Sequence, residues 1–392
     1  MQKKILDKLF CLIENGSFIV KYWDGTEYKH GKGQPMFRLI IKDKSIITRL
    51  VGNPALAFGE AYVDGQIDID GEIEEIIKII NLNKALIRKL TEWKIGNEFF
   101  GRTSVKQQKK DISHHYDLGN DFFALWLDPT MSYSCAYFRS AEDTLAAAQQ
   151  QKIDHTLKKL HLKPGETLLD IGSGWGWMIM HAASKYGVKS TGITLSQEQF
   201  DATKQRIKEM KMEDLVDVLL MDYRELEASG RKFDKVVSVG MLEHVGQQAL
   251  PAFLGAVRNI LKPGGLMLLH SITRDTEHSP NPWIEKYIFP GGYIPSLREL
   301  VWLLPEHDLH LLDMECLRIH YAMTLDRWAE AFEQNVEQVL QKYGERFVRM
   351  WRFYLRSCAA TFRHSGLSIH QLLYSRELNN DLPLTREHLY IS

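Results

Sequence analysis

The sequence predicts an α/β protein in which a doubly wound parallel sheet follows a small α+β N-terminal domain. Helix and strand patterns alternate from about residue 145 to residue 272, as is typical of a parallel sheet with helices on both faces. A glycine-rich turn over residues 172–176 joins a predicted strand to the helix after it. Residues 18–69 read instead as short strands separated by turns, which indicates a separate domain.

The N-terminal part is predicted to open with an amphipathic helix and to continue as strands. Six apolar residues share one face of the helix, with charged residues between them. These residues are Ile5, Leu6, Leu9, Phe10, Leu12 and Ile13. Strands are predicted at residues 18–23, 37–43, 45–50 and 66–70, followed by a helix at residues 71–83. We therefore predict an accessory domain over residues 1–85, a linker over residues 86–110 and a catalytic domain over residues 111–392.

The catalytic domain shows the expected alternation element by element. Strands are predicted at residues 167–171, 188–194, 216–222, 235–240 and 266–272. Helices are predicted at residues 144–160, 177–187, 197–210 and 247–261. After Thr273 the pattern loosens into an aromatic-rich segment with helices predicted at residues 325–343 and 345–363.

Composition excludes several classes of function. The chain has 392 residues and a net charge of −1, with 49 basic and 50 acidic side chains, so no global field attracts it to nucleic acid. The 4 cysteines form no C-x-x-C pair, which fits a reduced cytosol better than disulfides or a zinc site. No uncharged apolar run is long enough to span a membrane, and no His/Cys spacing suggests a metal. We expect a cytoplasmic protein without a metal.

A candidate nucleotide site lies where the first strand of the sheet meets its helix. Asp170 lies near the end of the strand, and Gly172, Gly174 and Gly176 let the backbone approach a ligand. A dinucleotide fingerprint would require Gly or Ala at position 177, where this chain has Trp177. NAD is therefore disfavoured, and the pattern resembles the first motif of Rossmann-like S-adenosylmethionine methyltransferases.

Further polar residues follow the other strands, at the sheet edge where such folds bind ligands. Thr194, Leu195 and Gln199 follow the second strand, and Asp222 and Tyr223 follow the third. An alternative role for Thr194 and the nearby Ser196 is capping of the next helix, and Asp222 could be an ordinary loop carboxylate. Many methyltransferases carry an acidic residue for the ribose hydroxyls where this chain has Thr194, so Gln199 or a backbone group would have to replace it.

Two segments before the sheet resemble the signature of cyclopropane-fatty-acyl-phospholipid synthases and mycolic acid cyclopropane synthases. They are His114–Phe123 and Leu127–Phe138, and residues 194–199, 241–246 and 287–292 resemble the same family. The resemblance implies the class I S-adenosylmethionine methyltransferase fold and cofactor contacts from Tyr133 and Ser134. Because the mycolic acid enzymes lack the strand-rich N-terminal domain, the resemblance favours the phospholipid branch, with an unsaturated phospholipid in the bilayer as substrate.

The reaction of that family adds a methylene across a cis double bond, which requires a donor, a dry pocket and a proton acceptor. The resemblance implies that bound bicarbonate is the base and names five residues that hold it. These are Cys135, Glu243, His270, the backbone of Ile272, and Tyr321. Other roles stay open: Cys135 as a nucleophile or buried apolar residue, and His270 as a structural histidine.

Two other functions remain possible from the sequence. A related lipid C-methyltransferase would leave a methyl or methylene branch in place of a ring, and a non-catalytic binding module could keep the scaffold alone. We expect the chain to work at the inner face of the membrane as a homodimer, with apolar residues of the first helix facing lipid. Basic residues that could meet headgroups are Lys3, Lys4, Lys8, Arg102, Lys106, Lys109 and Lys110. A first helix packed on its own domain is the alternative.

Overall fold

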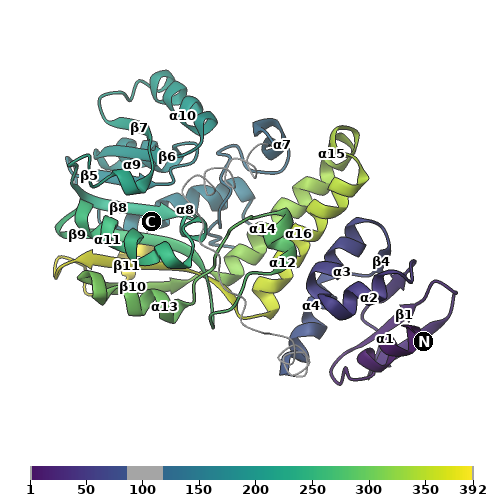
Figure 1. Ribbon diagram of the computed structural model, residues 1–392. Coiled ribbons are helices and arrows are strands. Elements are labelled where there is room, and N and C mark those ends of the chain that lie inside the picture. The colour runs from purple at the N-terminus through teal and green to yellow at the C-terminus, as the bar shows by residue number, and fades with distance from the viewer. Residues whose placement is uncertain (1, 86–117, 391–392) are drawn as a thin grey trace. The chain divides into compact units, whose positions relative to one another are not determined.

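The computed structural model describes residues 2–85 and 118–390, and these form two compact units (Figure 1). The first unit combines Met1–Gly101 with Ser279–Pro290 and Ala322–Gly366. The second combines Arg102–His278, Gly291–Tyr321 and Leu367–Ser392. The predicted linker falls outside the described residues, so the boundaries at 85 and 110 stay predictions. Residues 279–290 and 322–366, which lie within the predicted catalytic domain, cluster with residues 1–101.

The first unit contains a four-stranded sheet in the order β2-β1-β3-β4. Its N-terminal elements are α1 (Gln2–Phe10), β1 (Ser17–Lys21), β2 (Glu27–Gly31), β3 (Arg38–Ile41), α2 (Ile46–Gly52), α3 (Pro54–Val63), β4 (Ile67–Asp70) and α4 (Ile73–Leu82). β1 pairs antiparallel with β2 and parallel with β3, and β3 pairs antiparallel with β4. Leu6, Phe18, Val20 and Ile41 are buried in the core of this unit.

Two predictions for this unit are wrong. The strand predicted at residues 45–50 is the helix α2. Residues 54–63, which fall within the stretch predicted as strands and turns, form the helix α3. Ile46, Ile47 and Leu50 have helical spacing, and all three pack into the core. A short apolar run fits either periodicity, so its type is decided by what it packs against. α3 carries its own signal, since Asn53 caps it by accepting a hydrogen bond from the Leu56 N–H, with Pro54 at its first turn.

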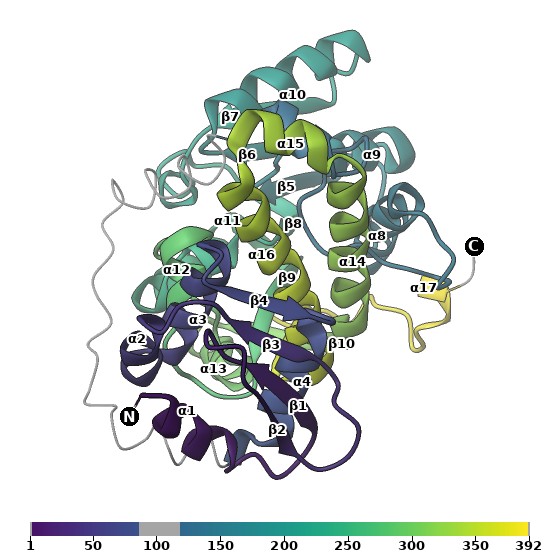
Figure 2. The same cartoon turned by 90° about the vertical axis from the view of Figure 1, so that its right-hand side faces the viewer.

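Helices from the C-terminal third complete the first unit. They are α12 (Pro282–Tyr287), residues 322–334 of α14 (Arg318–Gln334), α15 (Val336–Tyr343) and α16 (Glu345–His364). The single helix predicted at 325–343 begins earlier and is interrupted at Asn335, whereas α16 matches its prediction closely. α16 packs against α4 (Figure 2), and Arg363 and His364 both contact the Glu74 carboxylate, at 3.2 and 2.7 Å.

The second unit is built on a seven-stranded sheet in the order β10-β11-β9-β8-β5-β6-β7. The strands are β5 (Thr167–Ile171), β6 (Lys189–Thr194), β7 (Val216–Leu220), β8 (Phe233–Val239), β9 (Leu261–Arg274), β10 (Leu309–Cys316) and β11 (Leu367–Arg376). Five are parallel, as predicted, but β11 pairs antiparallel with both β9 and β10. The sheet is therefore mixed, and β10 and β11 were not predicted.

Helices cover both faces of this sheet. The main ones are α8 (Leu145–Lys159), α9 (Trp177–Tyr186), α10 (Gln197–Glu209), α11 (Leu250–Ile260) and α13 (Leu297–Leu303), with the shorter α7 (Asn120–Ala124) and α17 (Glu387–Tyr390). Neighbouring strand residues alternate between two cores: Leu168 packs with α8 and α9, whereas Leu169 packs with α11. The chain order reverses between β5 and β8, and ligands bind at such a switch point in open α/β sheets.

Candidate active site

The glycine-rich turn between β5 and α9 is shaped by its glycines. The backbone N–H groups of Gly172 and Ser173 both donate to the carbonyl oxygen of Ile193, each at 3.0 Å, which fixes the turn against β6. A Cβ at Gly174, where φ is +53°, would meet no atom within 4 Å, so there is open space beside it. A Cβ at Gly176, where φ is +82°, would lie 2.4 Å from the Thr203 methyl. Gly176 therefore allows close packing on α10.

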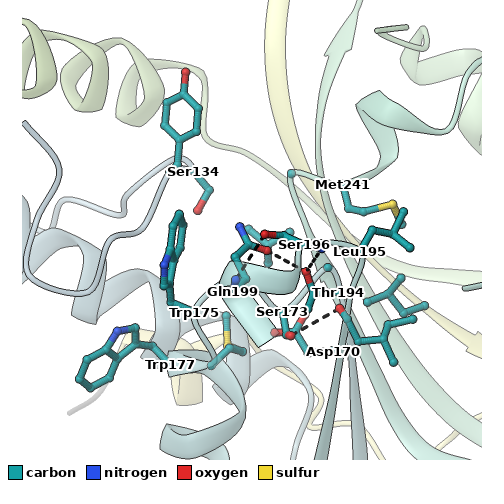
Figure 3. Close-up of a pocket in the computed structure, with 18 of the residues that line it drawn as sticks. Ser134, Asp170, Ser173, Trp175, Trp177, Thr194, Leu195, Ser196, Gln199 and Met241 are labelled. Atoms are coloured by element: carbon teal, nitrogen blue, oxygen red, sulfur yellow. Dashed lines mark hydrogen bonds between the residues drawn. The ribbon is translucent and has the colours of Figure 1, made fainter. Parts of the chain in front are cut away.

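A pocket of about 180 Å³ opens at the carboxyl ends of the parallel strands (Figure 3). Ten of the eleven predicted cofactor residues line it. These ten are Tyr133, Ser134, Asp170, Gly172, Gly174, Thr194, Leu195, Gln199, Asp222 and Tyr223. Gly176 is the one that does not line the pocket, in agreement with its packing role. Residues far apart in the sequence thus converge on one cavity.

Asp170 brings an unpaired carboxylate oxygen to this pocket. The side chain is 4% exposed, and its Oδ1 is buried without a hydrogen-bond partner among the described residues. Burial raises the pKa of the carboxyl to about 7, an effect that the nearby Lys152 ammonium opposes. A buried acceptor without a partner is costly, so this oxygen is suited to a cationic hydrogen-bond donor on a ligand.

The loop after β6 forms a small hydrogen-bonded network on the pocket wall (Figure 3). The Thr194 hydroxyl donates to Oε1 of Gln199 at 2.8 Å and accepts from the Ser196 N–H at 3.2 Å. The Ser196 hydroxyl accepts from the Gln199 N–H and caps α10. Of the two residues considered for capping, Ser196 is the cap. Thr194 orients Gln199, whose side-chain NH₂ remains available to donate to a ligand hydroxyl.

Asp222 lines the pocket, and its carboxylate is hydrogen-bonded to a side chain of the same loop. Its two carboxylate oxygens accept from Nε and Nη2 of Arg224 at 2.7 and 2.5 Å, and it caps the short helix Tyr223–Glu225. The guanidinium also lies over the Tyr223 ring, 5.3 Å from its centre. The loop-carboxylate role considered for Asp222 is thus present in the structure, and Arg224 contacts both side chains at the pocket.

Several pocket residues were missed from the sequence. They are Lys152, Trp175 and Trp177. Lys152 is 4% exposed and donates to the Ser134 hydroxyl at 3.0 Å, and burial lowers the pKa of its ammonium. Lys152, His155, Thr156 and Lys159 share one face of α8, and all four side chains are buried.

A second group of buried polar side chains includes Glu243, whose neighbours in the chain line the pocket. Glu243 stands between Met241 and His244, and its Oε1 accepts from the Ile272 N–H at 2.7 Å. Its Oε2 is buried without a partner among the described residues, and burial raises the pKa of the carboxyl. The backbone of Ile272, predicted to help hold bicarbonate, therefore donates its N–H to Glu243 and orients that carboxylate.

His270 provides the other unpaired atom of this group. It is fully buried on β9, two residues before Ile272, so both side chains lie on one face of the strand. Its Nδ1 is 3.1 Å from Nε2 of Gln371, while its Nε2 has no partner in the described part of the chain. Burial, reinforced by the charge of Lys152, lowers the pKa of the ring to about 3, so the imidazole is neutral near pH 7.

Cys135 and Tyr321 are joined to this group through the backbone. The fully buried Cys135 thiol lies 3.2 Å from the carbonyl oxygen of Ala136 and 4.0 Å from that of Leu317. The same Leu317 carbonyl accepts from the Tyr321 N–H, and the Leu317 N–H donates to Ile369, the β11 partner of Ile272. Both of these thiol contacts are with backbone carbonyl oxygens.

Other predicted residues are placed as follows. His114 and His115 lie outside the described residues, whereas His244 lines the pocket, and burial lowers its pKa to about 4. Within residues 2–85 and 118–390, no three His, Cys, Asp or Glu side chains are grouped to hold a metal ion. In the same ranges, no cysteine forms a disulfide.

Comparison with known proteins identifies relatives over most of the chain. Residues 103–372 match the mycolic acid cyclopropane synthetase family, and residues 5–89 match a domain family of unknown function. A probable fatty acid methyltransferase of Pseudomonas putida is 38% identical over 381 residues, covering 95% of each chain. The cyclopropane-fatty-acyl-phospholipid synthase of Escherichia coli K12 is 38% identical, covering 88% of this chain and 90% of that protein.

Solved structures agree with these relatives. The cyclopropane synthase MmaA2 of Mycobacterium tuberculosis superposes with a TM-score of 0.64 at 34% identity, covering 71% of this chain and all of that one. Mycolic acid cyclopropane synthase CmaA1 complexed with SAH and CTAB also gives 0.64, at 35% identity, covering 68% of this chain and 98% of that one.

Proposed function

The chain belongs to the mycolic acid cyclopropane synthetase family of S-adenosylmethionine-dependent methyltransferases, and from that premise we propose that it forms cyclopropane rings on unsaturated phospholipids. One observation carries the proposal. Two buried polar atoms, Nε2 of His270 and Oε2 of Glu243, lack hydrogen-bond partners among the described residues, and Glu243 lies in the chain between Met241 and His244, which line the pocket. The reaction needs a donor site and a proton-accepting site side by side.

The pocket residues fit S-adenosylmethionine. The unpaired Oδ1 of Asp170 can accept from the donor's ammonium group, and the open space beside Gly174 lets the donor lie against the backbone. Gln199, oriented by Thr194, can donate to the ribose in place of an acidic residue. When bound, the donor supplies an electrophilic methyl group. The chain's own contribution is to hold that group against the alkene and to keep water away.

The second group of residues fits bicarbonate. Adding a methyl carbon to an alkene and closing the ring requires removal of one proton from that carbon. Bicarbonate would supply the base. A bicarbonate ion offers oxygens that accept hydrogen bonds and one hydroxyl that donates, which complements a donor at His270 and the acceptor Oε2 at Glu243. The Ile272 N–H holds Glu243 in place, while Cys135 and Tyr321 complete the proposed cage.

Labelled methyl incorporation tests this function directly. Purified protein is incubated with methyl-labelled S-adenosylmethionine and vesicles of cis-unsaturated phospholipid, in buffer freed of carbon dioxide or supplemented with bicarbonate. We expect label in the acyl chains only with unsaturated lipid and a rate that rises with bicarbonate. Incorporation into saturated lipid would contradict the substrate, and a rate independent of bicarbonate would contradict the base.

A branched product is the second candidate. It is favoured by the relatives described as fatty acid methyltransferases, among them the Pseudomonas putida protein that matches 95% of this chain. Both reactions begin with methyl transfer to an alkene and differ in how the resulting cation is quenched. Proton NMR of the extracted lipid separates them, because cyclopropane protons resonate upfield of all branched-chain protons.

We further propose that the first unit docks on the bilayer surface. No described helix is long and apolar enough to cross a membrane. The apolar residues in and just after α1 differ in exposure. Leu6 is buried in its own unit, whereas Leu9 and, just beyond the helix, Leu12 are 37% and 41% exposed. Asn83 accepts from the backbone N–H groups of Glu14 and Asn15, which ties the segment after α1 to the end of α4.

These hydrogen bonds hold the segment after α1 against the end of α4, which carries further exposed apolar residues. Ile80 and Leu82, at the end of α4, are 45% and 50% exposed. Lys4, Lys8 and Lys84 are exposed on the same two segments, a composition suited to an anionic lipid surface. Lys3 is instead bonded to Asp24 at 3.0 Å, and the basic residues between 102 and 110 lie outside the described ranges.

Replacing both Leu9 and Leu12 by Asn should weaken binding to anionic vesicles by roughly tenfold, because apolar area that would enter the lipid is lost at ~25 cal/mol per Å². Flotation at low salt measures the bound fraction. Leu220→Asn is the matched control, since Leu220 is a comparably exposed leucine of the other unit. Equal binding by the double variant and the control would argue against docking through α1.

A homodimer on the inner face of the membrane completes the proposal. Symmetric pairs are the most frequent assemblies of folded chains. Sedimentation equilibrium of the purified protein measures the mass directly, and a monomer at micromolar concentration would contradict the dimer.

A further inference from the structure

Gln371 lies directly opposite His270 in the antiparallel pair of β11 and β9. Both side chains are buried, at 1% and 0% exposure. The Gln371 amide nitrogen Nε2 is 3.1 Å from Nδ1 of His270 and 3.1 Å from the hydroxyl of Thr156 on α8. The ring of His270 is therefore held from its Nδ1 side by an amide that is itself anchored to a helix.

This contact decides which ring nitrogen carries the proton. A neutral imidazole has one donor and one acceptor nitrogen, and an amide NH₂ can only donate. With its Nε2 facing the ring, Gln371 donates to Nδ1, which leaves the proton on Nε2. That nitrogen is buried and has no partner in the described part of the chain. The ring thus presents a lone N–H donor on the side away from Gln371.

We propose that Gln371 is a positioning residue that fixes His270 in the Nε2–H tautomer, so that the ring donates a hydrogen bond to the small anion that serves as base. This inference rests on the proposed function. With the opposite tautomer, both Nε2 of His270 and Oε2 of Glu243 would be acceptors, and an anion would meet two acceptors at once. Fixing the tautomer therefore adapts the site to an anion that also carries a hydroxyl.

The surroundings of the ring keep it neutral, so the tautomer matters. The charged or titratable groups that act on His270 are Lys152, Lys159, His155 and Glu315. Glu315 is bonded to both His155 at 2.6 Å and Lys159 at 2.5 Å, so its negative charge is largely balanced. The burial and the remaining positive charge disfavour an imidazolium, which would donate from both nitrogens and make Gln371 unnecessary.

Nitrogen-15 NMR of the histidine rings tests the inference without substrate or bicarbonate. The His270 signals are assigned by their loss in His270→Gln. We expect the wild-type protein to show a neutral ring protonated at Nε2. At a pH where the new side chain is ionised, Gln371→Glu places a carboxylate that can only accept against Nδ1, so the proton should appear on Nδ1. A wild-type ring protonated at Nδ1, or an unchanged spectrum in Gln371→Glu, would overturn the proposal.

A second variant separates positioning from folding and from the proposed base. Gln371→Met keeps the volume but removes the donor, and the ring should then populate both tautomers. The bicarbonate concentration for half-maximal turnover should rise by about tenfold, as for loss of other orienting partners, while the Kd for S-adenosylhomocysteine stays unchanged. Gln371→Met that keeps the wild-type tautomer contradicts the inference. If wild-type turnover ignores bicarbonate, the proposed base fails, and the NMR result still decides the role of Gln371.

Discussion

Glu243→Gln should reduce ring formation by about 10²–10⁴-fold, the range typical for loss of a group that acts in proton transfer. The amide oxygen of the new side chain can still accept from the Ile272 N–H, so the side chain keeps its place. The group at the position of Oε2 can become an NH₂ donor, which cannot accept the bicarbonate hydroxyl. Product formation is measured by NMR of lipid from vesicles treated with each protein.

Two further measurements serve as controls for this prediction. The Kd for S-adenosylhomocysteine, measured by calorimetry, should be unchanged, since Glu243 does not line the donor pocket. The wild-type rate should fall with decreasing pH through a value above the ordinary range of a glutamate, because burial raises the pKa of Glu243 and the ionised form is the one required. Wild-type turnover by the Glu243→Gln protein would remove Glu243 from the mechanism.

Asp170→Asn should weaken binding of the methyl donor by about 10- to 100-fold, since a hydrogen bond to a charged group contributes roughly 1.5–3 kcal/mol. The Asp170 carboxyl has a pKa of about 7. An ammonium group binds its ionised form, so below about pH 7 wild-type affinity should fall by up to tenfold per pH unit; above about pH 8 the donor's own α-amino group loses its proton, whichever protein is used. The Asp170→Asn protein should lose the dependence below about pH 7, which calorimetry at a series of pH values measures.

Asp170→Asn should weaken binding of the methyl donor but stabilise the fold of the free protein. A carboxyl whose pKa is raised on folding stabilises the fold fully below its unfolded pKa, and this stabilisation is lost as the pH rises through the folded value of about 7. Without added donor, Asp170→Asn should therefore raise the Tm at pH 8 more than at pH 5. Asp234→Asn is the contrasting control: bonds to Lys262 and Thr167 lower the pKa of Asp234, so its loss should lower the Tm at pH 8.

The parallel part of the sheet and its ligand pocket could be predicted from sequence because their signals are local. Each strand and helix shows its own period, and Asp170, Thr194 and Asp222 lie at or just after strand ends. The strands β10 and β11 could not be predicted in the same way, because β11 lies antiparallel between β10 and β9, and β9 is about 100 residues earlier in the chain. Gln371, the neighbour of His270, was hidden for the same reason.

The buried face of α8 shows a second limit. Lys152, His155 and Lys159 would normally indicate a solvated side of a helix, yet each is at most 4% exposed. Their partners are Ser134 and Glu315, which are distant in sequence from the charges they pair with. A pattern of polar residues reveals burial only once the pairing groups are known, so Lys152 could not be assigned to the pocket beforehand.

The first unit takes its parts from both ends of the chain, and this has a consequence for biosynthesis. α4 rests on α16, and Arg349 donates to backbone oxygens of Tyr62 and Ile67. Arg349 is synthesised 287 residues after Tyr62. The N-terminal segment therefore lacks its packing partners while most of the second unit is translated. Residues 1–85 produced alone should therefore be poorly folded, and chaperones that guard nascent apolar surface should bind this chain early.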